Sequence, residues 1–208
     1  MTEHEDSTRE AALAPTAGEA VLYVDVGSPY AYLAAERAAA VLGAAPRLQP
    51  VLLGGLFKLT GRSSWALGDA ARRNAGMAEI EARALRYGLP PLRWPEPWPG
   101  DYLRPMRVVT AAWLRSPAAG EAVLRAGFRR MFVAGEDLAQ EHVLRAATAD
   151  AGQDPGELLA AAATAPVKQA LRDWTGAAHA RGVFGVPTLA LGERLLWGDD
   201  RLDEAAPR

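Results

Sequence analysis

Short apolar runs lie near both ends of the chain, and helical patterns lie between them. VLYVDV, at about residues 21–26, is a β-branched apolar run that predicts a buried central strand. PRLQPVLLGG, at about 46–55, predicts a second strand, and a right-handed crossover would make the two strands parallel. Near the C-terminus, PTLAL and RLLW flank Gly192-Glu193, which predicts a β-hairpin because glycine tolerates the positive φ of tight turns.

The residues between these runs follow the three- and four-residue spacing of amphipathic helices. Ser28 is a strong helix N-cap, the proline after it suits the first helical position, and Gly43 suits the end of that helix. A proline- and tryptophan-rich stretch at 89–105 predicts irregular structure. Asp199 is interpreted as the cap of a short closing helix. Further helices are expected over about 69–88, 105–116, 119–133, 138–151, 154–165 and 166–182.

This order of elements predicts one α/β domain that is interrupted by a helical insertion. Residues 19–55 and 156–208 would form the α/β domain, and residues 56–155 would form the all-helical insertion. Residues 1–18 are charged and small without an apolar period, so we expect a disordered tail there. A chain of 208 residues, 50% of them hydrophobic, can bury a core of this size.

Charge and composition exclude several classes of function. The formal net charge of −2 gives no attraction to nucleic acid or to a membrane surface. No apolar run approaches the roughly 20 residues of a membrane helix, and an acidic N-terminus is unlike a secretory signal, so we expect a cytoplasmic protein. The absence of cysteine excludes disulfides and dithiol oxidoreductase chemistry. The three histidines have no partners at metal-ligand spacing, so no metal site is expected.

Ser28 allows two interpretations from the residues alone. A serine at a helix N-cap contributes about 1 kcal/mol of stability, and capping is a sufficient reason for its presence. The same position also gathers a hydroxyl and free backbone N–H groups at one point, where an anion is stabilised. Lowering the pKa of a thiol by two units needs about 2.7 kcal/mol. A hydrogen bond to a charge, roughly 1.5–3 kcal/mol, together with the helix dipole, roughly 0.3–1 kcal/mol, is of that size.

Four motifs occur in an order that resembles a known family. They are the strand followed by SPY and a helix, LLGGLFKLTG, WPEPWPGDYLRPMR, and GVFGVPTLALGERLLWGDDRL. Together they resemble the 2-hydroxychromene-2-carboxylate isomerase family, which is close to kappa-class glutathione transferases and to the DsbA-type thioredoxin-like fold. The resemblance covers nearly the whole chain after about residue 20. It implies an α/β thioredoxin-like fold with a large all-helical insertion, glutathione or another low-molecular-weight thiol as cofactor, a small aromatic substrate, and a homodimer.

The resemblance also implies roles for the residues that match the family's motifs around the thiol. In the family the serine that matches Ser28 activates the sulfur of the cofactor, so Ser28 is the expected catalytic residue. Val186-Pro187 matches a cis-proline corner beside that serine, where the backbone of Val186 would pair with the cofactor. From the residues alone, an ordinary trans proline that begins a strand is strongly favoured because cis bonds are rare, and only the resemblance reverses this preference.

Other matches concern the far end of the cofactor and the substrate. The GDDR segment implies that Asp200 and Arg201 hold the γ-glutamyl end, although solvated charge is the alternative interpretation. Lys58, in LFKLTG, is a candidate to bind the cofactor or an acidic group of the substrate. Arg62 stands where an asparagine is common and Val26 where an aromatic residue is common, which bears on the substrate and on the identity of the thiol. The substrate pocket is expected to contain Pro29, Tyr30, Phe57, Lys58 and Trp98.

Three functions follow from these patterns. The first is the thiol-dependent isomerisation of a 2-hydroxychromene-2-carboxylate-like aromatic compound. The second is the conjugation of electrophiles to glutathione by a kappa-type transferase. The third, from another class, is a non-catalytic module that holds extended peptides in the groove beside Pro187. A measured affinity for glutathione separates the third from the first two, because a peptide-binding module needs no site at Lys58 or at Asp200 and Arg201.

Overall fold

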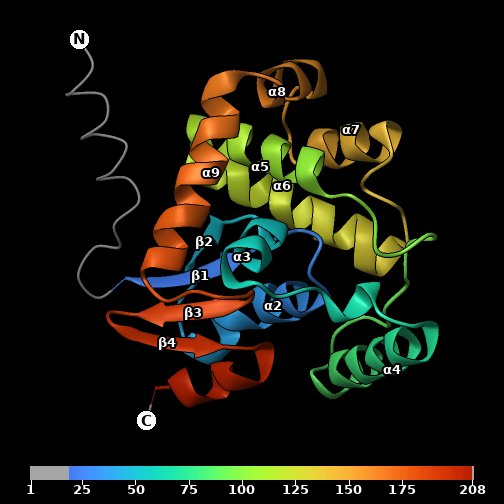
Figure 1. The fold of residues 1–208 in the computed structure, drawn as a ribbon, viewed down its shortest axis with the longest axis vertical. Coiled ribbons are helices and arrows are strands. Elements are labelled where there is room, and N and C mark those ends of the chain that lie inside the picture. The colour runs from blue at the N-terminus through green and yellow to red at the C-terminus, as the bar shows by residue number, and fades with distance from the viewer. Residues whose placement is uncertain (1–18, 208) are drawn as a thin grey trace.

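The computed structural model describes residues 19–207, which form a four-stranded sheet with helices around it (Figure 1). The strands are β1 (Ala20–Val24), β2 (Arg47–Pro50), β3 (Thr188–Leu191) and β4 (Arg194–Trp197), in the order β2-β1-β3-β4. β1 and β2 are parallel, whereas β3 is antiparallel to both β1 and β4. The predicted parallel pair and the predicted C-terminal hairpin are therefore confirmed.

The second strand is shorter than predicted, because residues 53–60 are helical. β2 ends at Pro50, and helix α3 (Leu53–Thr60) begins shortly after it. The N–H of Leu52 donates to Thr175 Oγ1 at 2.9 Å, and the N–H of Leu53 donates to Asp25 Oδ2 at 2.7 Å. Side-chain oxygens thus accept from the backbone N–H groups that would otherwise have bonded to a neighbouring strand if β2 were longer. The apolar pattern alone does not separate a buried strand from a short helix.

Helix α2 (Pro29–Leu42) connects β1 to β2, and it begins and ends where the sequence predicts. Ser28 Oγ accepts a hydrogen bond from the N–H of Ala31 at 3.2 Å, and Gly43 follows the helix with a φ of 73°. The other α-helices are α4 (Ala70–Arg86), α5 (Leu103–Arg115), α6 (Pro117–Arg129), α7 (Glu141–Asp150), α8 (Pro155–Ala162) and α9 (Ala165–Ala180). A π-helical turn, η2 (Arg130–Ala134), continues α6, and η1 (Trp65–Leu67) is a short 3₁₀ segment.

Helices α4 to α7 lie within the predicted insertion of residues 56–155, whereas α3 and α8 (Pro155–Ala162) cross its two boundaries. Figure 1 shows α5 to α8 gathered on the side of the molecule away from β4. The boundary of the insertion at residue 56 stays a prediction, since α3 already begins at Leu53. The predicted disordered tail, residues 1–18, lies outside the described residues.

β1 is buried on both faces, which explains its continuous apolar run. Leu22 and Val24 join the larger core with α2 and α5 to α8, whereas Val21 and Tyr23 join a smaller core with α3 and the segment before β3. The strand therefore ends between two packed layers. Asp25 and Val26 follow directly after it and are both buried, so the turn from β1 into α2 begins inside the core.

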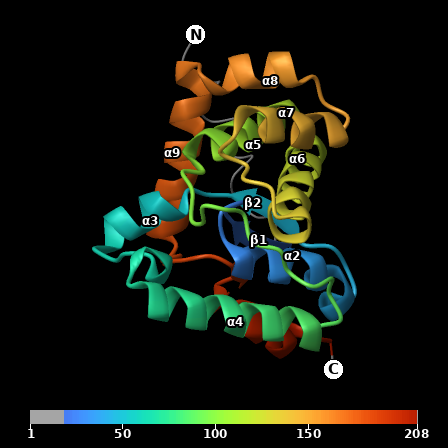
Figure 2. The same cartoon turned by 90° about the vertical axis from the view of Figure 1, so that its right-hand side faces the viewer.

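Asp199 does not act as the predicted helix cap. It is the first residue of the 3₁₀ segment η3 (Asp199–Ala205), and its side chain is 1% exposed. Its carboxylate accepts hydrogen bonds from Arg83 Nη1 and from the Tyr87 hydroxyl, each at 2.9 Å. These bonds connect the C-terminal segment to the end of α4, which crosses in front of that segment in Figure 2. The partners lie more than 100 residues away in the chain, so no local pattern indicated them.

Candidate functional site

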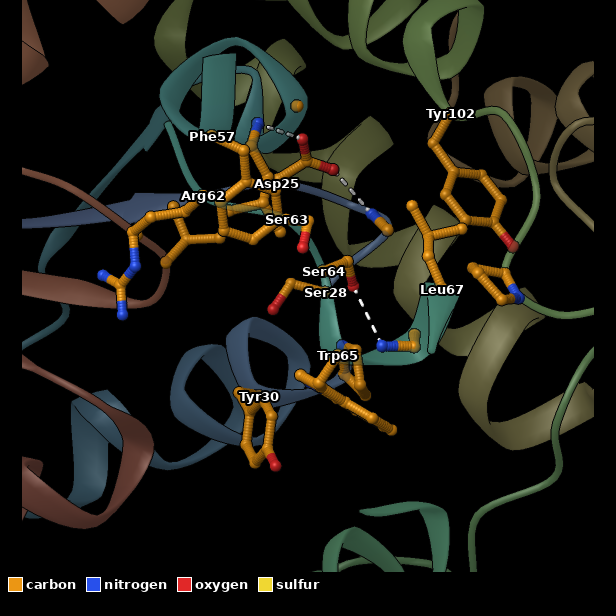
Figure 3. A pocket seen from close by; sticks show the side chains of 18 of the residues that line it. Asp25, Ser28, Tyr30, Phe57, Arg62, Ser63, Ser64, Trp65, Leu67 and Tyr102 are labelled. Atoms are coloured by element: carbon orange, nitrogen blue, oxygen red, sulfur yellow. Dashed lines mark hydrogen bonds between the residues drawn. The ribbon is translucent and has the colours of Figure 1, made fainter. Parts of the chain in front are cut away.

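A cavity of about 570 Å³ opens where four separate segments meet the N-terminal end of α2. These segments are the start of α3, residues 62–67 with η1, residues 98–103 before α5, and residues 184–186 before β3. Figure 3 shows side chains from several of them, including Ser28, Tyr30, Phe57, Arg62 and Trp65, around the cavity. The fold therefore brings together parts of the chain that are up to about 170 residues apart, from Asp25 to Trp197, and it does so at the carboxyl end of β1.

Ser28 lines this cavity at the point where the first turn of α2 begins. It is 3% exposed, and its Oγ accepts the N–H of Ala31, so the capping role is confirmed. Within residues 19–207 its hydroxyl proton is donated to no acceptor, and the N–H of Tyr30 has no partner. A serine hydroxyl can accept and donate at the same time. Capping and anion binding are thus compatible at Ser28.

Val186 also lines the cavity, and the Val186-Pro187 peptide bond is cis. The carbonyl of Pro187 accepts a hydrogen bond from the N–H of Gly198 at 3.0 Å, while Thr188 pairs with Tyr23 of β1. Neither the N–H nor the carbonyl of Val186 has a hydrogen-bonding partner in the described range of the chain. One donor and one acceptor of the backbone therefore remain available to a bound molecule. Pro187 itself does not line the cavity.

Asp25 is a cavity residue that the sequence reasoning missed. Its Oδ1 accepts the N–H of Gly27 at 2.8 Å, and its Oδ2 accepts the N–H of Leu53 at 2.7 Å. Burial raises the pKa of this carboxyl to about 6, although both hydrogen bonds act to lower it. The side chain joins the turn before α2 to the first turn of α3, which are two walls of the cavity. A carboxylate directly after a fully apolar run was the available signal.

Aromatic side chains form much of the remaining wall. The rings of Tyr30 and Trp65 meet edge-on with centroids 6.3 Å apart, and Trp98 lies 5.6 Å from Trp65. Tyr102 packs so closely on Gly27 that a Cβ at this glycine would overlap its ring. Pro29, Tyr30, Phe57 and Trp98, which were all predicted for the substrate pocket, line the cavity. Such a wall suits a flat apolar molecule.

The predicted charged residues are not brought into the cavity. Lys58 is exposed on α3 and does not line it. Arg201 is held by Glu204, with hydrogen bonds of 2.6 and 2.8 Å, and Asp200 has a side chain that is 60% exposed. Neither Asp200 nor Arg201 lines the cavity. A lysine's position in a motif did not reveal on which face of α3 it would lie.

Arg62 and Arg72 are the two arginines that line the cavity, and Arg62 lies against two aromatic rings. Its guanidinium lies 5.1 Å from the ring centre of Phe184 and 5.4 Å from that of Trp197, and all three residues line the cavity. The residue that departs from the family's pattern therefore lies at the site, while Lys58 does not. Stacking on two rings holds the guanidinium in place and leaves its N–H groups free for an anion.

Neither a metal site nor a membrane-spanning helix is found among the described residues. Within the described part of the chain, no group of three or more histidines and carboxylates could hold a metal ion. Across residues 19–207, no helix has the length and apolar character needed to cross a membrane.

Known proteins with similar sequences cover nearly the whole chain. The family model of the DSBA-like thioredoxin domain matches residues 20–207. Glutathione S-transferase kappa 1 of Rattus norvegicus is 29% identical over 197 residues, which cover 88% of this chain and 86% of that protein. A 2-hydroxychromene-2-carboxylate isomerase of Sphingobium xenophagum is 28% identical over 127 residues, or 61% of this chain and 63% of that protein.

Solved structures give the same picture of the fold. The structure of a 2-hydroxychromene-2-carboxylate isomerase superposes with a TM-score of 0.72, and it covers 88% of this chain and 90% of that one. The sequences of the two are 23% identical. At that level the likeness concerns the fold alone.

Proposed function

The chain belongs to the DsbA-like thioredoxin family, and from this premise we propose that it is a thiol-dependent enzyme acting on a small aromatic substrate. The α/β thioredoxin-like fold with its helical insertion is confirmed, and curated relatives are named as glutathione transferases and as an isomerase. The proposed reaction is the isomerisation of a 2-hydroxychromene-2-carboxylate-like compound. The proposal rests on one observation about Ser28. Its hydroxyl proton has no acceptor within residues 19–207, and the hydroxyl lies at a helix N-terminus in a cavity with aromatic walls. The chain has no cysteine that could act in its place.

The residues around Ser28 fit the sulfur end of glutathione or a similar thiol. The hydroxyl of Ser28 and the N–H of Tyr30 would donate to a thiolate, and both lack an acceptor in the range 19–207. The free N–H and carbonyl of Val186 would pair with an amide of the cofactor. These donors favour the charged form of the thiol by roughly 2–4 kcal/mol, which is enough to make the thiolate dominant at neutral pH.

The far end of the cofactor fits differently from the expectation. Arg62, rather than the expected Lys58, would bind a carboxylate of the cofactor, because its guanidinium lies at the cavity and Lys58 does not. Asp200 and Arg201 remain proposed contacts of the γ-glutamyl end. Arg201 would have to exchange Glu204 for the ligand, which is feasible because the pair is exposed.

The chemistry assigned to the thiol is that of a nucleophile which adds reversibly to a conjugated double bond, so that the bond can rotate before the thiol leaves. Ser28 would hold the sulfur in its reactive form. Tyr30, Trp65 and Trp98 would position the aromatic ring and exclude water from it. The chain thus supplies activation and orientation rather than the nucleophile.

Kappa-type conjugation of an electrophile to glutathione is the second candidate, since it needs the same activated sulfur. The aromatic wall favours a substrate with an aromatic ring in either case. The third candidate, a peptide-holding module, would use the free backbone of Val186 but has no need of the Ser28 hydroxyl. We also propose that the protein is cytoplasmic and that it forms a homodimer. Size-exclusion chromatography with light scattering would test the homodimer through its molar mass.

Two measurements test the proposal. Titration calorimetry with glutathione should detect binding, and a spectroscopic assay should detect turnover of a 2-hydroxychromene-2-carboxylate only when the thiol is added. Formation of a thioether product instead of the isomer would assign the transferase. Binding of extended peptides without any measurable binding of glutathione would assign the peptide-holding module and overturn the enzyme.

A further inference from the structure

A second groove, of about 1020 Å³, shares no lining residue with the Ser28 cavity, and the proposed function does not use it. α2 and α6 are in contact, and both can be followed in Figure 2. The groove is lined by residues of these two helices, by η2, by the end of α7 and by the loop after α4. Its lining contains four arginines but only two carboxylates, whereas the lining of the Ser28 cavity contains two of each.

Two polar groups on α2 lie at this groove without a hydrogen-bonding partner. Tyr32 is 1% exposed, and its hydroxyl has no partner among residues 19–207. Glu36 Oε1 is buried and accepts no hydrogen bond. Arg125 Nη1 lies 3.7 Å from that oxygen, too far for a hydrogen bond, and instead donates to the carbonyl of Ala35 at 3.1 Å. A buried carboxylate oxygen without a donor is costly, so a donor from a ligand would stabilise it.

Two arginines at the same groove are free to bind an anion. Arg93, on the loop after α4, and Arg129, at the end of α6, are exposed, and neither side chain has a partner in the described range. Arg130 differs, because Glu136 and Asp150 each accept from it at 2.7 Å. Two free guanidinium groups from different segments suit a group with several anionic oxygens, such as a phosphate.

We propose that this groove binds a hydroxyl-bearing organic phosphate, of which a sugar phosphate and a nucleoside monophosphate are the two sources. Arg93 and Arg129 would hold the phosphate, and a hydroxyl of the ligand would donate to Glu36 Oε1. Burial raises the pKa of Tyr32 to about 12, so its hydroxyl stays protonated at neutral pH and can donate to a second oxygen. The volume is far larger than inorganic phosphate needs and is near the upper end of the roughly 300–1,000 Å³ of small-molecule sites.

Calorimetric titration of the full chain with four compounds tests this proposal. Ribose 5-phosphate and adenosine 5′-monophosphate are the candidates, and inorganic phosphate and adenosine are the controls. We expect at least one organic phosphate to bind about tenfold more tightly than inorganic phosphate. Tighter binding of the nucleotide assigns a nucleoside monophosphate, and equal affinity of the two assigns a sugar phosphate. If neither exceeds inorganic phosphate, the proposal is overturned.

Three variants locate the binding. The double variant Arg93→Ala, Arg129→Ala changes only exposed side chains, so it should fold normally and bind every phosphate at least about tenfold more weakly. Glu36→Met, which keeps the length of the side chain but carries no oxygen acceptor, should bind inorganic phosphate at least as well as before but lose the advantage of the organic phosphates. Arg172→Ala removes an exposed arginine of α9 outside the groove and should change nothing. Retained affinity in the double variant would place the ligand elsewhere and overturn the assignment.

Discussion

Two polar clusters lie on either side of Tyr30, and they differ in whether their groups already have protein partners. At Ser28, a hydroxyl proton and backbone groups of Tyr30 and Val186 are unpaired within residues 19–207. Behind the ring of Tyr30, which lies 5.5 Å from the Arg83 guanidinium, the carboxylate of Asp199 is fully occupied by Arg83 and Tyr87. Unpaired groups at a cavity can bind a ligand at no cost to the fold, whereas paired and buried ones hold the fold together.

The largest expected effect tests the paired cluster. Asp199→Ala removes the buried acceptor that Arg83 and Tyr87 share, although Arg83 keeps its ion pair with Glu79. The free energy of unfolding should therefore fall by about 3 kcal/mol, with little change in thiol affinity. Urea denaturation and calorimetry measure the two quantities. Asp203→Ala, at an exposed ion pair with Arg37, is the control and should cost under about 1 kcal/mol. If Asp199→Ala is as stable as the wild type but no longer binds the thiol, Asp199 serves ligand binding rather than the stability of the fold, and the comparison is wrong.

Asp25 sharpens the comparison through pH, because it is buried like Asp199 but has no cationic partner in the described range. Its folded pKa of about 6 exceeds the unfolded value of 3.8, so the unfolded state loses its proton first as the pH rises. This group therefore stabilises the fold less and less from about pH 4 to pH 6, by roughly 3 kcal/mol in all, and the loss is complete above pH 6.

Asp25→Asn should remove that pH dependence, because an amide does not titrate in this range. The free energy of unfolding of the wild type, relative to the variant, should be roughly 2.5 kcal/mol higher at pH 4 than at pH 7. Urea denaturation at both pH values measures it. Asp154→Asn changes an exposed N-cap to another good cap and should give no such difference. Parallel pH profiles for wild type and Asp25→Asn would contradict the assignment.

The next effect tests the unpaired cluster directly. Ser28→Ala should lower thiol-dependent turnover by roughly 10²-fold, equivalent to about 2.7 kcal/mol, because the thiolate loses its hydroxyl donor. The lost cap should also cost about 1 kcal/mol of stability. Ser116→Ala is the matched control, since Ser116 Oγ caps α6 by accepting from Ala119 but lies outside the cavity. If Ser28→Ala keeps the full rate of the wild type, Ser28 is only a cap.

The parts of the site that the residues predict without the family resemblance are those made by near neighbours in the chain. Ser28 caps α2 through a bond to the third residue after it, and the hairpin turns on the positive φ of Gly192, so local patterns were sufficient. Asp199 was misinterpreted because its partners belong to α4. The motif predicted Lys58 at the site. Residues 53–60 are helical rather than extended, however, and in this helix Phe57 lines the cavity whereas Lys58 does not.

The smallest effect compares two cations that the same motif supplies. Arg62 lies at the cavity over Phe184 and Trp197, while Lys58 is exposed elsewhere on α3. Arg62→Gln should weaken glutathione binding about tenfold, or about 1.4 kcal/mol, because one carboxylate loses its charged partner while the side chain keeps much of its length. Lys58→Gln removes the same charge and should change the affinity less than twofold. Calorimetry at two salt concentrations measures both, and the loss in Arg62→Gln should shrink as salt rises. If Lys58→Gln instead weakens glutathione binding more than Arg62→Gln does, Lys58 binds the carboxylate and the exposed surface of α3 is part of the site.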